Sequence, residues 1–401
     1  MIPVEEARAR ILEVLSPTGA ETVPLAEAWG RILAAPLAAR LTQPPADVSA
    51  MDGYALRAAD GGLGAVLRVI GSAPAGHPFA GSIGSGEAIR IFTGGLLPDG
   101  ADAILLQEDA TADSDKVTVN EAVQPARWIR RRGLDFTAGD TLLQAGRKLT
   151  ARDVGLAAAS NHPWLSVHRR PRIAILATGD EIVLPGEPLP PGGIVSSNAH
   201  ALSALVRAAG AEPMVLPIAG DSENAIAQAA AAARGADLLV TTGGASVGEH
   251  DLVQQALGPQ GFSLDFWKIA MRPGKPLIWG RLGQTPLLGL PGNPVSALVC
   301  GVLFLCPAIA RLAGLPAAPL PFQPAVLGAA LTANDKREDY LRAGVHRDAG
   351  GTLVVTPAPR QDSSMLRILA GSDALLKRAP LAAALPAGAV VEVLLLSDFG
   401  V

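Results

Sequence analysis

Between residues 171 and 316, short apolar runs alternate with segments in which apolar residues recur every three or four positions. The runs "RIAILAT", "EPMVLPI" and "DLLVTT" have the length of buried strands, and "SNAHALSALVRAAG" has the period of an amphipathic helix, with Ser197 or Asn198 as its expected N-cap. Strands that alternate with helices indicate a parallel, doubly wound sheet covered on both faces. We therefore predict a central α/β domain over residues 171–317.

The two flanking regions have other patterns. In the N-terminal region, residues 1–170, we expect helical or extended chain over 1–44 and 133–170, beginning with the helix-periodic "VEEARARILEVL". A β-rich insert of short runs punctuated by Gly and Pro occupies about 45–132. Residues 318–401 hold several short β-like runs between turn residues, which predicts a small β-barrel, with a sandwich as the alternative. The fold class expected is thus α/β plus β.

One apolar segment could be mistaken for a membrane span. No charged residue occurs between Leu282 and Ala310, but prolines and glycines interrupt this segment. Its longest clean run, Val295 to Cys306, is shorter than the roughly 20 residues that a spanning helix needs. We therefore predict a buried helix and no membrane association.

Composition narrows the class of protein. A length of 401 residues predicts several domains, and a formal net charge of −4 gives no general basic field, so nucleic acid is not expected as a partner. The two cysteines, Cys300 and Cys306, lie in the apolar segment and lack the spacing of a zinc or redox pair. Because the N-terminal stretch also lacks the pattern of a secretory signal, we expect a cytoplasmic protein.

Polar and glycine-rich loops follow several of the predicted strands. In an open α/β sheet, ligands bind beyond the carboxyl ends of the strands, where these loops diverge. The loops that this rule selects are 178–181 ("TGDE"), 241–251 ("TTGGASVGEHD"), 271–276 ("MRPGKP") and 290–296 ("LPGNPVS"). We expect them to meet at one edge of the sheet.

The side chains of these loops have complementary chemistry. Gly243, Gly244 and Ser246 suit a phosphate, because glycines let backbone N–H groups approach an anion. The loops also supply cations and hard oxygen ligands of the kind that Mg²⁺ prefers. These are Lys268, Arg272 and Lys275, and Asp180, Glu181, Glu249 and Asp251. Taken singly, each feature is more often a tight turn, a helix cap or a solvated side chain, so only their coincidence predicts a site for a phosphorylated ligand with a divalent cation.

Other classes of enzyme are poorly supported. The sequence has no G-x-S-x-G elbow, no P-loop and no G-x-G-x-x-G fingerprint. His250 beside Asp251 is the one tempting base, and we favour a structural or surface role for it. Outside the central domain, "SAMDGYA" around Asp52, "RIFTGG" with Thr93 and "RRRGLDF" with Asp135 stand out, although each could be a capped turn or a solvated charge run.

Motifs along nearly the whole chain resemble one family. In order they are "SAMDGYA", "TGGLLPDGADAIL", "ATGDEIVLPGE", "TTGGASVGEHDLV", "MRPGKP" and "GLPGNPVSA". They look like the molybdopterin molybdenumtransferases, the MoeA family, which is related to the E domain of gephyrin. The resemblance implies the last step of molybdenum cofactor synthesis, in which molybdate enters adenylylated molybdopterin and AMP is released in the presence of Mg²⁺.

The resemblance also implies an assembly and a set of site residues. It predicts a homodimer of four-domain subunits whose cleft includes the β-rich insert of the partner. It also allows contact with the molybdopterin adenylyltransferase. Carried over by motif, the residues expected to handle metal and water are Asp52, Glu181, Asp221 and Asp251. Other residues are expected to bind substrate, some carried over by motif and some taken from the glycine-rich loop. They are Thr93, Asp135, Gly243, Gly244, Ser246, Lys268, Arg272, Lys275, Pro291, Pro294, Arg342 and Ser363.

Some positions depart from the family pattern, and three alternatives stay open. Arg272 stands where lysine is frequent, and "EHD" replaces the more usual end of the glycine-rich loop. The alternatives are an enzyme like the molybdopterin adenylyltransferase, which shares the α/β domain; a non-catalytic scaffold; and a paralogue that uses tungstate. The N-terminal and C-terminal regions argue against the first, and the absence of an appended tethering region argues against the second.

Overall fold

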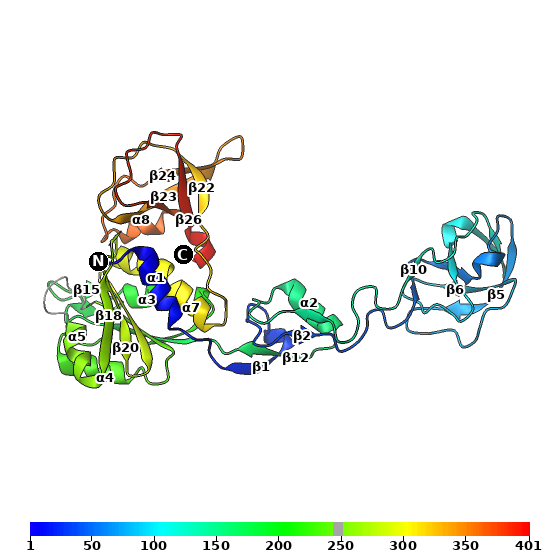
Figure 1. Cartoon of the computed structure of the whole chain (residues 1–401), viewed down its shortest axis with the longest axis horizontal. Helices are drawn as coiled ribbons and strands as arrows, with labels where there is room; N and C mark the ends of the chain where they lie inside the picture. The colour runs from blue at the N-terminus through cyan, green and yellow to red at the C-terminus, as the bar shows by residue number, and fades with distance from the viewer. Residues whose placement is uncertain (244–251) are drawn as a thin grey trace.

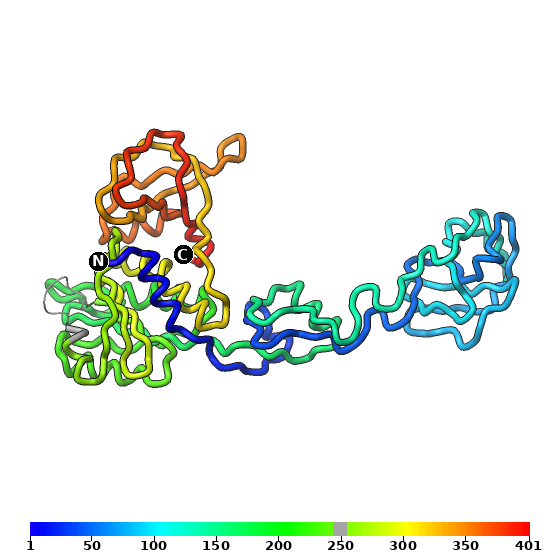
Figure 2. The backbone as a smooth tube through the Cα atoms, viewed as in Figure 1, coloured from blue at the N-terminus to red at the C-terminus, as the bar shows by residue number. Residues whose placement is uncertain are grey.

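The molecule is elongated, with a two-lobed body at one end and a small domain at the other (Figures 1 and 2). The computed structural model describes residues 1–243 and 252–401. The body comprises residues 1–15 and 171–401, the arm comprises 16–44 and 133–170, and the distal domain comprises 45–132. The chain passes along the arm twice, so the distal domain is an insertion that leaves from and returns to the same side of the body.

A six-stranded sheet forms the centre of the body. In spatial order its strands are β16 (Glu212–Val215), β13 (Arg172–Ala177), β17 (Leu238–Thr242), β21 (Thr285–Leu290), β20 (Pro276–Leu282) and β18 (Phe262–Lys268). Alternate residues of β13 enter two separate cores, Ile173 and Ile175 on one face and Ala174 and Leu176 on the other. This alternation is the period of a strand buried on both sides, and it confirms the doubly wound α/β domain.

Helices cover both faces of this sheet. One face carries α3 (Asn198–Ala208), α6 (Pro294–Cys300) and α7 (Cys306–Leu312), and the other carries α4 (Glu223–Ala231) and α5 (Leu252–Leu257). The sheet is mixed rather than wholly parallel, because β20 runs antiparallel to both β18 and β21. These strands follow one another without an intervening helix, and short connections require antiparallel pairing.

The helix ends show only some of the capping interactions that their local sequence predicts. Ser222 caps α4 by accepting a hydrogen bond from the N–H of Ala225 at 3.2 Å, and Gly210 has the left-handed backbone, φ +86°, that commonly follows a helix end. Ser197 is the N-cap residue of α3, but its side chain makes no capping hydrogen bond. Ser197 is thus confirmed as the N-cap position of α3, but no side-chain hydrogen bond satisfies the helix start there.

The apolar segment is confirmed as a buried helix. It runs from Pro294 to Leu312, is long and apolar enough to cross a membrane, and has 78% of its most apolar window buried. A π-helical stretch, Gly301–Leu305, joins α6 to α7 ahead of Pro307, which cannot donate an N–H to a regular ladder. Burial raises the pKa of the Cys306 thiol to about 12, which keeps it protonated and unreactive.

The second lobe of the body is a closed barrel of five strands, which confirms the predicted β-barrel. Around the barrel they are β23 (Glu338–Arg347), β24 (Leu353–Pro357), β22 (Gln323–Leu327), β26 (Val390–Leu395) and β25 (Ala374–Arg378), which pairs back to β23. A short helix, α8 (Leu366–Ala370), follows the loop after β24. The strand β19 (Met271–Arg272) of the central domain pairs with β23, so the two lobes share a ladder.

The first helix, α1 (Val4–Glu13), differs from its expected place in the N-terminal region. Its stripe of Val4, Ala7 and Ile11 is buried in the core between the central sheet and the barrel. That core also contains Tyr340 of the barrel. Because one core joins the helix to both lobes, the helix belongs to the body and not to the arm.

The arm and the distal domain have cores of their own. In the arm, β1 (Ala20–Pro24) pairs with β12 (Trp164–His168), β2 (Leu37–Ala38) pairs with β11 (Thr141–Leu143), and α2 (Ala151–Ala159) packs beside them. A 3₁₀ turn, Leu25–Glu27, lies between β1 and β2. The distal sheet has the order β7 (Ala103–Leu106), β4 (Gly53–Leu56), β6 (Glu87–Ile91), β5 (Val66–Ala73), β9 (Lys116–Val119) and β8 (Ala110–Asp113), and β3 (Val48–Ser49) pairs with β10 (Ile129–Arg130) beside it.

Candidate functional site

A cleft of about 680 Å³ lies at the carboxyl ends of the parallel strands β13, β17 and β21. Part of one wall is the short ribbon of β14 (Ile182–Val183) and β15 (Ile194–Val195). The predicted site residues that line it are Glu181, Gly243, Pro291 and Pro294. Residues of all four predicted loops thus meet here, the loop 271–276 through its last residue, Pro276.

The floor of the cleft is tied together by Asn198. Its Nδ2 donates to Thr242 Oγ1 at 2.9 Å and to the carbonyl oxygen of Gly292 at 2.7 Å. The hydroxyl of Thr242 in turn donates to the carbonyl oxygen of Pro291 at 3.3 Å. These bonds join the start of α3, the end of β17 and the turn after β21, so loops distant in the sequence keep one arrangement.

A loop of the barrel closes one side of the cleft. Asn293 Nδ2 donates to Ser363 Oγ at 2.9 Å, and the N–H of Val295 donates to the Ser363 carbonyl at 3.2 Å. The next residue, Ser364, lines the cleft and is held by Asp362, whose carboxylate accepts from its hydroxyl at 2.6 Å. Ser363 therefore lies at the edge of the site and links the two lobes.

Arg342 lies beneath this loop and does not line the cleft. It is 1% exposed, and its Nη2 donates to the carbonyl oxygen of Asp362 at 3.3 Å. Gln361 accepts from the Arg342 N–H and donates to its carbonyl oxygen, each at 2.9 Å. Burial lowers the pKa of the Arg342 guanidinium. In this arrangement Arg342 supports the loop that carries Ser363.

The backbone of the basic loop, residues 268–275, is held along both edges. Ile2 donates its N–H to the Lys268 carbonyl at 3.2 Å and accepts from the Ala270 N–H at 2.9 Å. On the other side, Glu338 of the barrel donates its N–H to the Ala270 carbonyl at 2.8 Å. The N-terminal segment and the barrel together fix the position of this loop.

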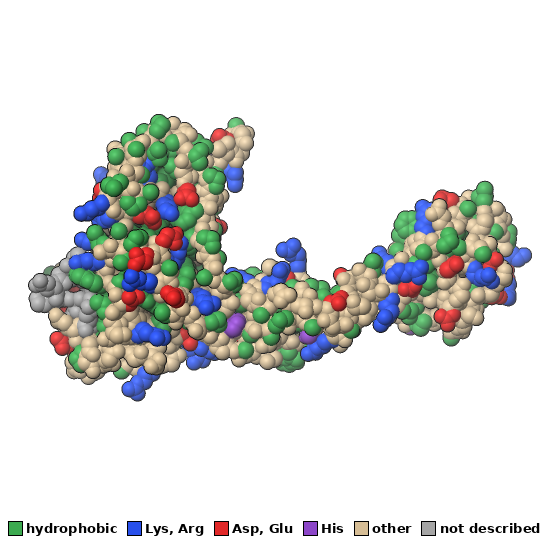
Figure 3. Space-filling view, viewed as in Figure 1, with side chains coloured by type: hydrophobic (Ala, Val, Ile, Leu, Met, Phe, Trp, Pro, Cys, Tyr) green, Lys and Arg blue, Asp and Glu red, His purple; other side chains and the backbone are tan. Residues whose placement is uncertain are grey.

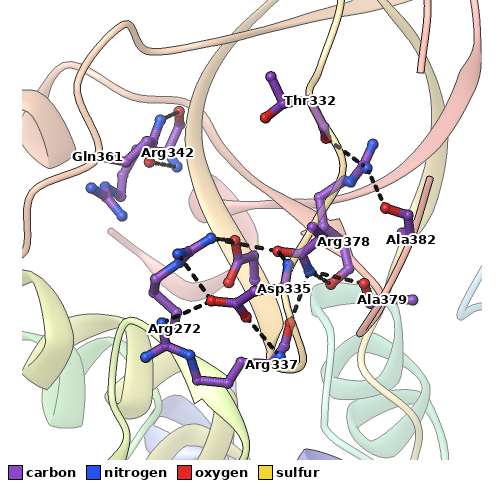
Figure 4. A network of polar contacts seen from close by, with 11 residues as sticks. Arg272, Thr332, Asp335, Arg337, Arg342, Gln361, Arg378, Ala379 and Ala382 are labelled. Atoms are coloured by element: carbon purple, nitrogen blue, oxygen red, sulfur yellow. Dashed lines mark hydrogen bonds and ion pairs between the residues drawn. The ribbon is translucent and has the colours of Figure 1, made fainter. Parts of the chain in front are cut away.

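The basic side chains of this loop have different surroundings. Arg272 forms an ion pair with the buried Asp339 of the barrel and another with Asp335 at 3.4 Å (Figure 4). The hydrogen bond to Asp339 raises the pKa of Arg272. Lys268 lies with its Nζ 3.5 Å from the centre of the Trp267 ring, and Lys275 is half-buried beside the cleft residue Pro276. Arg272, predicted to bind substrate, is thus used to join the lobes.

The predicted carboxylates Glu181 and Asp221, with Asp180, do not form a metal site by themselves. The N–H of Asp221 donates to Asp180 Oδ1 at 2.9 Å, and that of Asp180 donates to Asp221 Oδ2 at 3.4 Å, so these two acids lie together. Glu181 is exposed at the cleft. Within residues 1–243 and 252–401, no group of three or more His, Cys, Asp or Glu side chains is arranged to hold a metal ion. The predicted residues Gly244, Ser246 and Asp251 lie outside the described residues.

The remaining predicted residues lie away from the cleft. In the distal domain, Asp52 Oδ1 accepts from the Thr93 N–H at 2.7 Å and from the Thr93 hydroxyl at 2.9 Å. These hydrogen bonds lower the pKa of Asp52. Asp135 is exposed where the arm meets the distal domain, a region in which basic side chains also gather (Figure 3). Because the distal domain lies at the far end of the molecule, one chain does not bring Asp52 to its own cleft.

The sequence prediction missed several residues that line the cleft. Thr178, Asn198, Thr242, Asn293 and Ser364 contribute side chains there. Most of them lie inside or next to the predicted loops, so the rule that located the loops could have included them. Asn198 was noticed as a helix cap, and only the three-dimensional arrangement shows its contacts with Thr242 and Gly292.

Family models match three consecutive parts of the chain. The MoeA N-terminal region (domain I and II) matches residues 2–160, a probable molybdopterin-binding domain matches 174–311, and the MoeA C-terminal region (domain IV) matches 324–396. These parts correspond to the arm with the distal domain, the central domain and the barrel. The α1 helix falls within the first model, although it packs in the body.

Relatives and solved structures agree with these matches. Molybdopterin molybdenumtransferase 2 of Mycobacterium tuberculosis is 37% identical over 390 residues, which cover 94% of this chain and 95% of the relative. Molybdopterin molybdenumtransferase of a Nostoc species is 38% identical over 336 residues, 81% of this chain and 77% of the relative. The crystal structure of the molybdopterin biosynthesis MoeA protein from Pyrococcus horikoshii superposes with a TM-score of 0.85 at 27% identity, covering 98% and 100% of the two chains. This chain belongs to the molybdopterin molybdenumtransferase family, the MoeA family.

Proposed function

We propose that the protein is a molybdopterin molybdenumtransferase, which inserts molybdate into adenylylated molybdopterin and releases AMP in the last step of molybdenum cofactor synthesis. Its support is the end-to-end match to relatives that bear this name, together with a cleft at the loops that the motifs predicted. We also propose a cytoplasmic location, which suits a chain whose two cysteines are buried free thiols.

The chemistry of the cleft suits this reaction. Hydrolysis of a phosphoanhydride needs positioning and charge neutralisation more than it needs a protein nucleophile. The cleft has backbone of glycine and proline turns, hydroxyl groups and one carboxylate, and the half-buried Lys275 lies beside it. The sulfur ligands of molybdenum come from the substrate, so no protein thiol is needed near the cleft.

We propose a homodimer because Asp52 and Thr93 lie far from the cleft of their own chain. These residues lie together, and their geometry is that of a prepared carboxylate rather than a solvated one. The distal domain lies at the end of a long arm (Figure 2), so a second copy can bring it over the cleft of the first. Two such exchanges form a closed, two-fold symmetric dimer with two identical sites.

We further propose that the reaction depends on Mg²⁺. This ion is usually held by one or two carboxylates and by substrate phosphates, with water filling the remaining positions. Glu181 presents its carboxylate at the cleft, and the mutually bonded Asp180 and Asp221 include its neighbour in the chain. A phosphoanhydride bound between them supplies the phosphate oxygens. When bound, the ion would supply positive charge that stabilises the phosphate oxygens as AMP departs. The adenylylated substrate is the product of a molybdopterin adenylyltransferase, which we propose as a partner.

The test is release of AMP from adenylylated molybdopterin by the purified protein. We expect release to require both Mg²⁺ and molybdate, and to stop when EDTA removes the ion. Tungstate in place of molybdate separates a molybdate enzyme from a tungstate paralogue. Failure of the intact dimer to release AMP under all these conditions, with substrate still bound, would reject the transferase and favour a scaffold.

A further inference from the structure

The side chain of Asn198 is unusual because both of its N–H groups are used inside the protein. One donates to the hydroxyl of Thr242 and the other to the carbonyl oxygen of Gly292. At the first position of α3 an asparagine would be expected to serve the helix terminus, but neither Asn198 nor Ser197 makes a capping bond to it. The residue instead lines the cleft.

Simple hydrogen-bond chemistry fixes the orientation of this amide. The carbonyl oxygen of Gly292 can only accept, so the atom of Asn198 that lies 2.7 Å from it must be nitrogen. The hydroxyl of Thr242 already donates its hydrogen to the carbonyl oxygen of Pro291. Its oxygen must therefore accept a hydrogen bond from Asn198 Nδ2. The carboxamide oxygen, Oδ1, is thereby turned away from both partners. Its one contact within the described residues is the Ser197 hydroxyl at 3.5 Å, the outer limit of a hydrogen bond.

The surroundings of Asn198 suit a flat ring. Ile182, Ile194 and Val195 line the cleft from the β14–β15 ribbon, and Ile194 and Val195 stay 55% and 43% exposed. The prolines of the turn after β21 add further apolar surface. Pockets for heteroaromatic ligands combine such walls with a few fixed polar atoms that determine orientation. A fixed acceptor among apolar walls is therefore selective for a ring that carries an N–H donor.

We propose that Asn198 is a ligand-binding residue that accepts a hydrogen bond, at Oδ1, from an N–H group of an amino-substituted heteroaromatic ring. The inference rests on the proposed function, whose substrate contains two such rings, the pterin and the adenine. Thr242 and Gly292 act as positioning groups, because they hold the amide in the orientation that presents its oxygen. The rest of the substrate, with its phosphates, extends toward the carboxylates and Lys275.

The experiment measures dissociation constants by calorimetry for AMP, for a pterin monophosphate and for ribose 5-phosphate, which lacks a ring. For Asn198→Ala, we expect binding of one ring ligand to weaken by about five- to tenfold, the range for one neutral hydrogen bond. The affinity for ribose 5-phosphate should stay within about twofold of wild type. The ring ligand that loses affinity identifies whether Asn198 contacts pterin or adenine. Asn198→Ser, well tolerated at a helix start, is the second variant if alanine impairs folding.

Thr242→Val removes one of the two hydrogen bonds that hold the amide and keeps Oδ1 itself. We expect it to weaken binding of the same ring ligand by about two- to threefold, less than Asn198→Ala does, while the affinity for ribose 5-phosphate stays within about twofold of wild type. A fall in all three affinities by the same factor in Asn198→Ala would show that Asn198 is only structural. If wild-type protein bound neither ring ligand while remaining folded, the proposed function would fail first and this inference with it.

Discussion

The body and the distal domain hold their site residues in different ways. In the body, the cleft is built from loops tied to one another through Asn198 and through the barrel loop at Ser363, above a core shared by three parts of the chain. In the distal domain, Asp52 stands on a surface turn and is oriented by one neighbour, Thr93. The body thus forms a place for a ligand, whereas the distal domain presents a prepared carboxylate. In the homodimer proposed above, the distal domain of one copy completes the cleft of the other.

The largest expected effect comes from removing a carboxylate from either half. We expect Asp52→Ala and Glu181→Ala each to reduce AMP release by at least about a hundredfold, since both remove charge that is positioned for the transition state. Co-expressed in equal amounts, the two inactive variants should recover about a quarter of wild-type activity, because half of the dimers then contain one intact site of two. The measurement is steady-state AMP release from the purified mixture.

Two results bear on this comparison. No recovery in a mixture shown to contain mixed dimers would place both carboxylates in the same chain's site. The double variant Asp52→Ala/Glu181→Ala, co-expressed with wild type, is the control: its mixed dimers keep one half of each site and should add no activity beyond that of the wild-type dimers.

A smaller effect is expected in stability at the junction of the two lobes. Arg272→Ala leaves Asp339, whose side chain is 4% exposed, without its partner. Loss of one member of a buried pair typically costs 3–5 kcal/mol, and because Arg272 itself is half exposed we expect about 3 kcal/mol here. Hydrogen exchange of amides in β23 should detect the loss as faster opening, while amides of the distal sheet keep their rates.

The matched control for this junction is Asp335→Ala. Asp335 also pairs with Arg272, at 3.4 Å, but its side chain is 45% exposed. We expect a change of no more than about 1 kcal/mol, as for other surface pairs. Equal protection of β23 amides in wild type and Arg272→Ala would mean that the ion pair does not hold the lobes together. Arg272→Lys should fall between the two, because lysine keeps the charge but not the forked geometry.

The smallest effect concerns the support of Asp52. Thr93→Val removes the hydroxyl donor and keeps the backbone donor, so the pKa of Asp52, lowered in the wild type, should rise part of the way to its ordinary value. The ionised carboxylate is present above its pKa and is lost as the pH falls through it. The acid limb of the activity profile should therefore move to higher pH, with a loss of about threefold at neutral pH from poorer orientation. An unchanged acid limb in Thr93→Val would show that another group controls it.

Much of the architecture could be predicted from periodicity. The alternation of Ile173 and Ile175 with Ala174 and Leu176 is readable as a strand buried on both sides, and the loops after such strands locate the cleft. The direction of β20 could not be predicted in the same way, because an apolar strand has the same composition whichever way it runs. The position of α1 could not be predicted either. An amphipathic stripe indicates that one face of a helix is buried, but it does not indicate which core that face joins.

The types of residue at the site could be predicted from the sequence, but the side chains that these residues contact could be predicted less well. Arg272 was expected to bind substrate, but the buried carboxylate that it meets, Asp339, lies 67 positions away in another lobe. Arg342 was placed with the substrate-binding residues, and the structure buries it beneath the barrel loop. Asp52 and Glu181 belong to one motif set but lie at opposite ends of the molecule. Pairings of this kind depend on tertiary packing, which local sequence does not encode.

The place of α1 has a consequence for the order in which the protein can assemble during synthesis. The helix is translated before the arm and the distal domain, yet its stripe lies in a core that includes Tyr340 of the barrel, and the preceding residue Ile2 pairs with Ile269. The distal domain, whose contacts are local, can fold as soon as its own residues have emerged. The first helix must wait, unpaired and amphipathic, until the central domain and the barrel have been translated. The body therefore reaches its native form only after the barrel has emerged, so a chain that stops before the barrel cannot display a finished cleft.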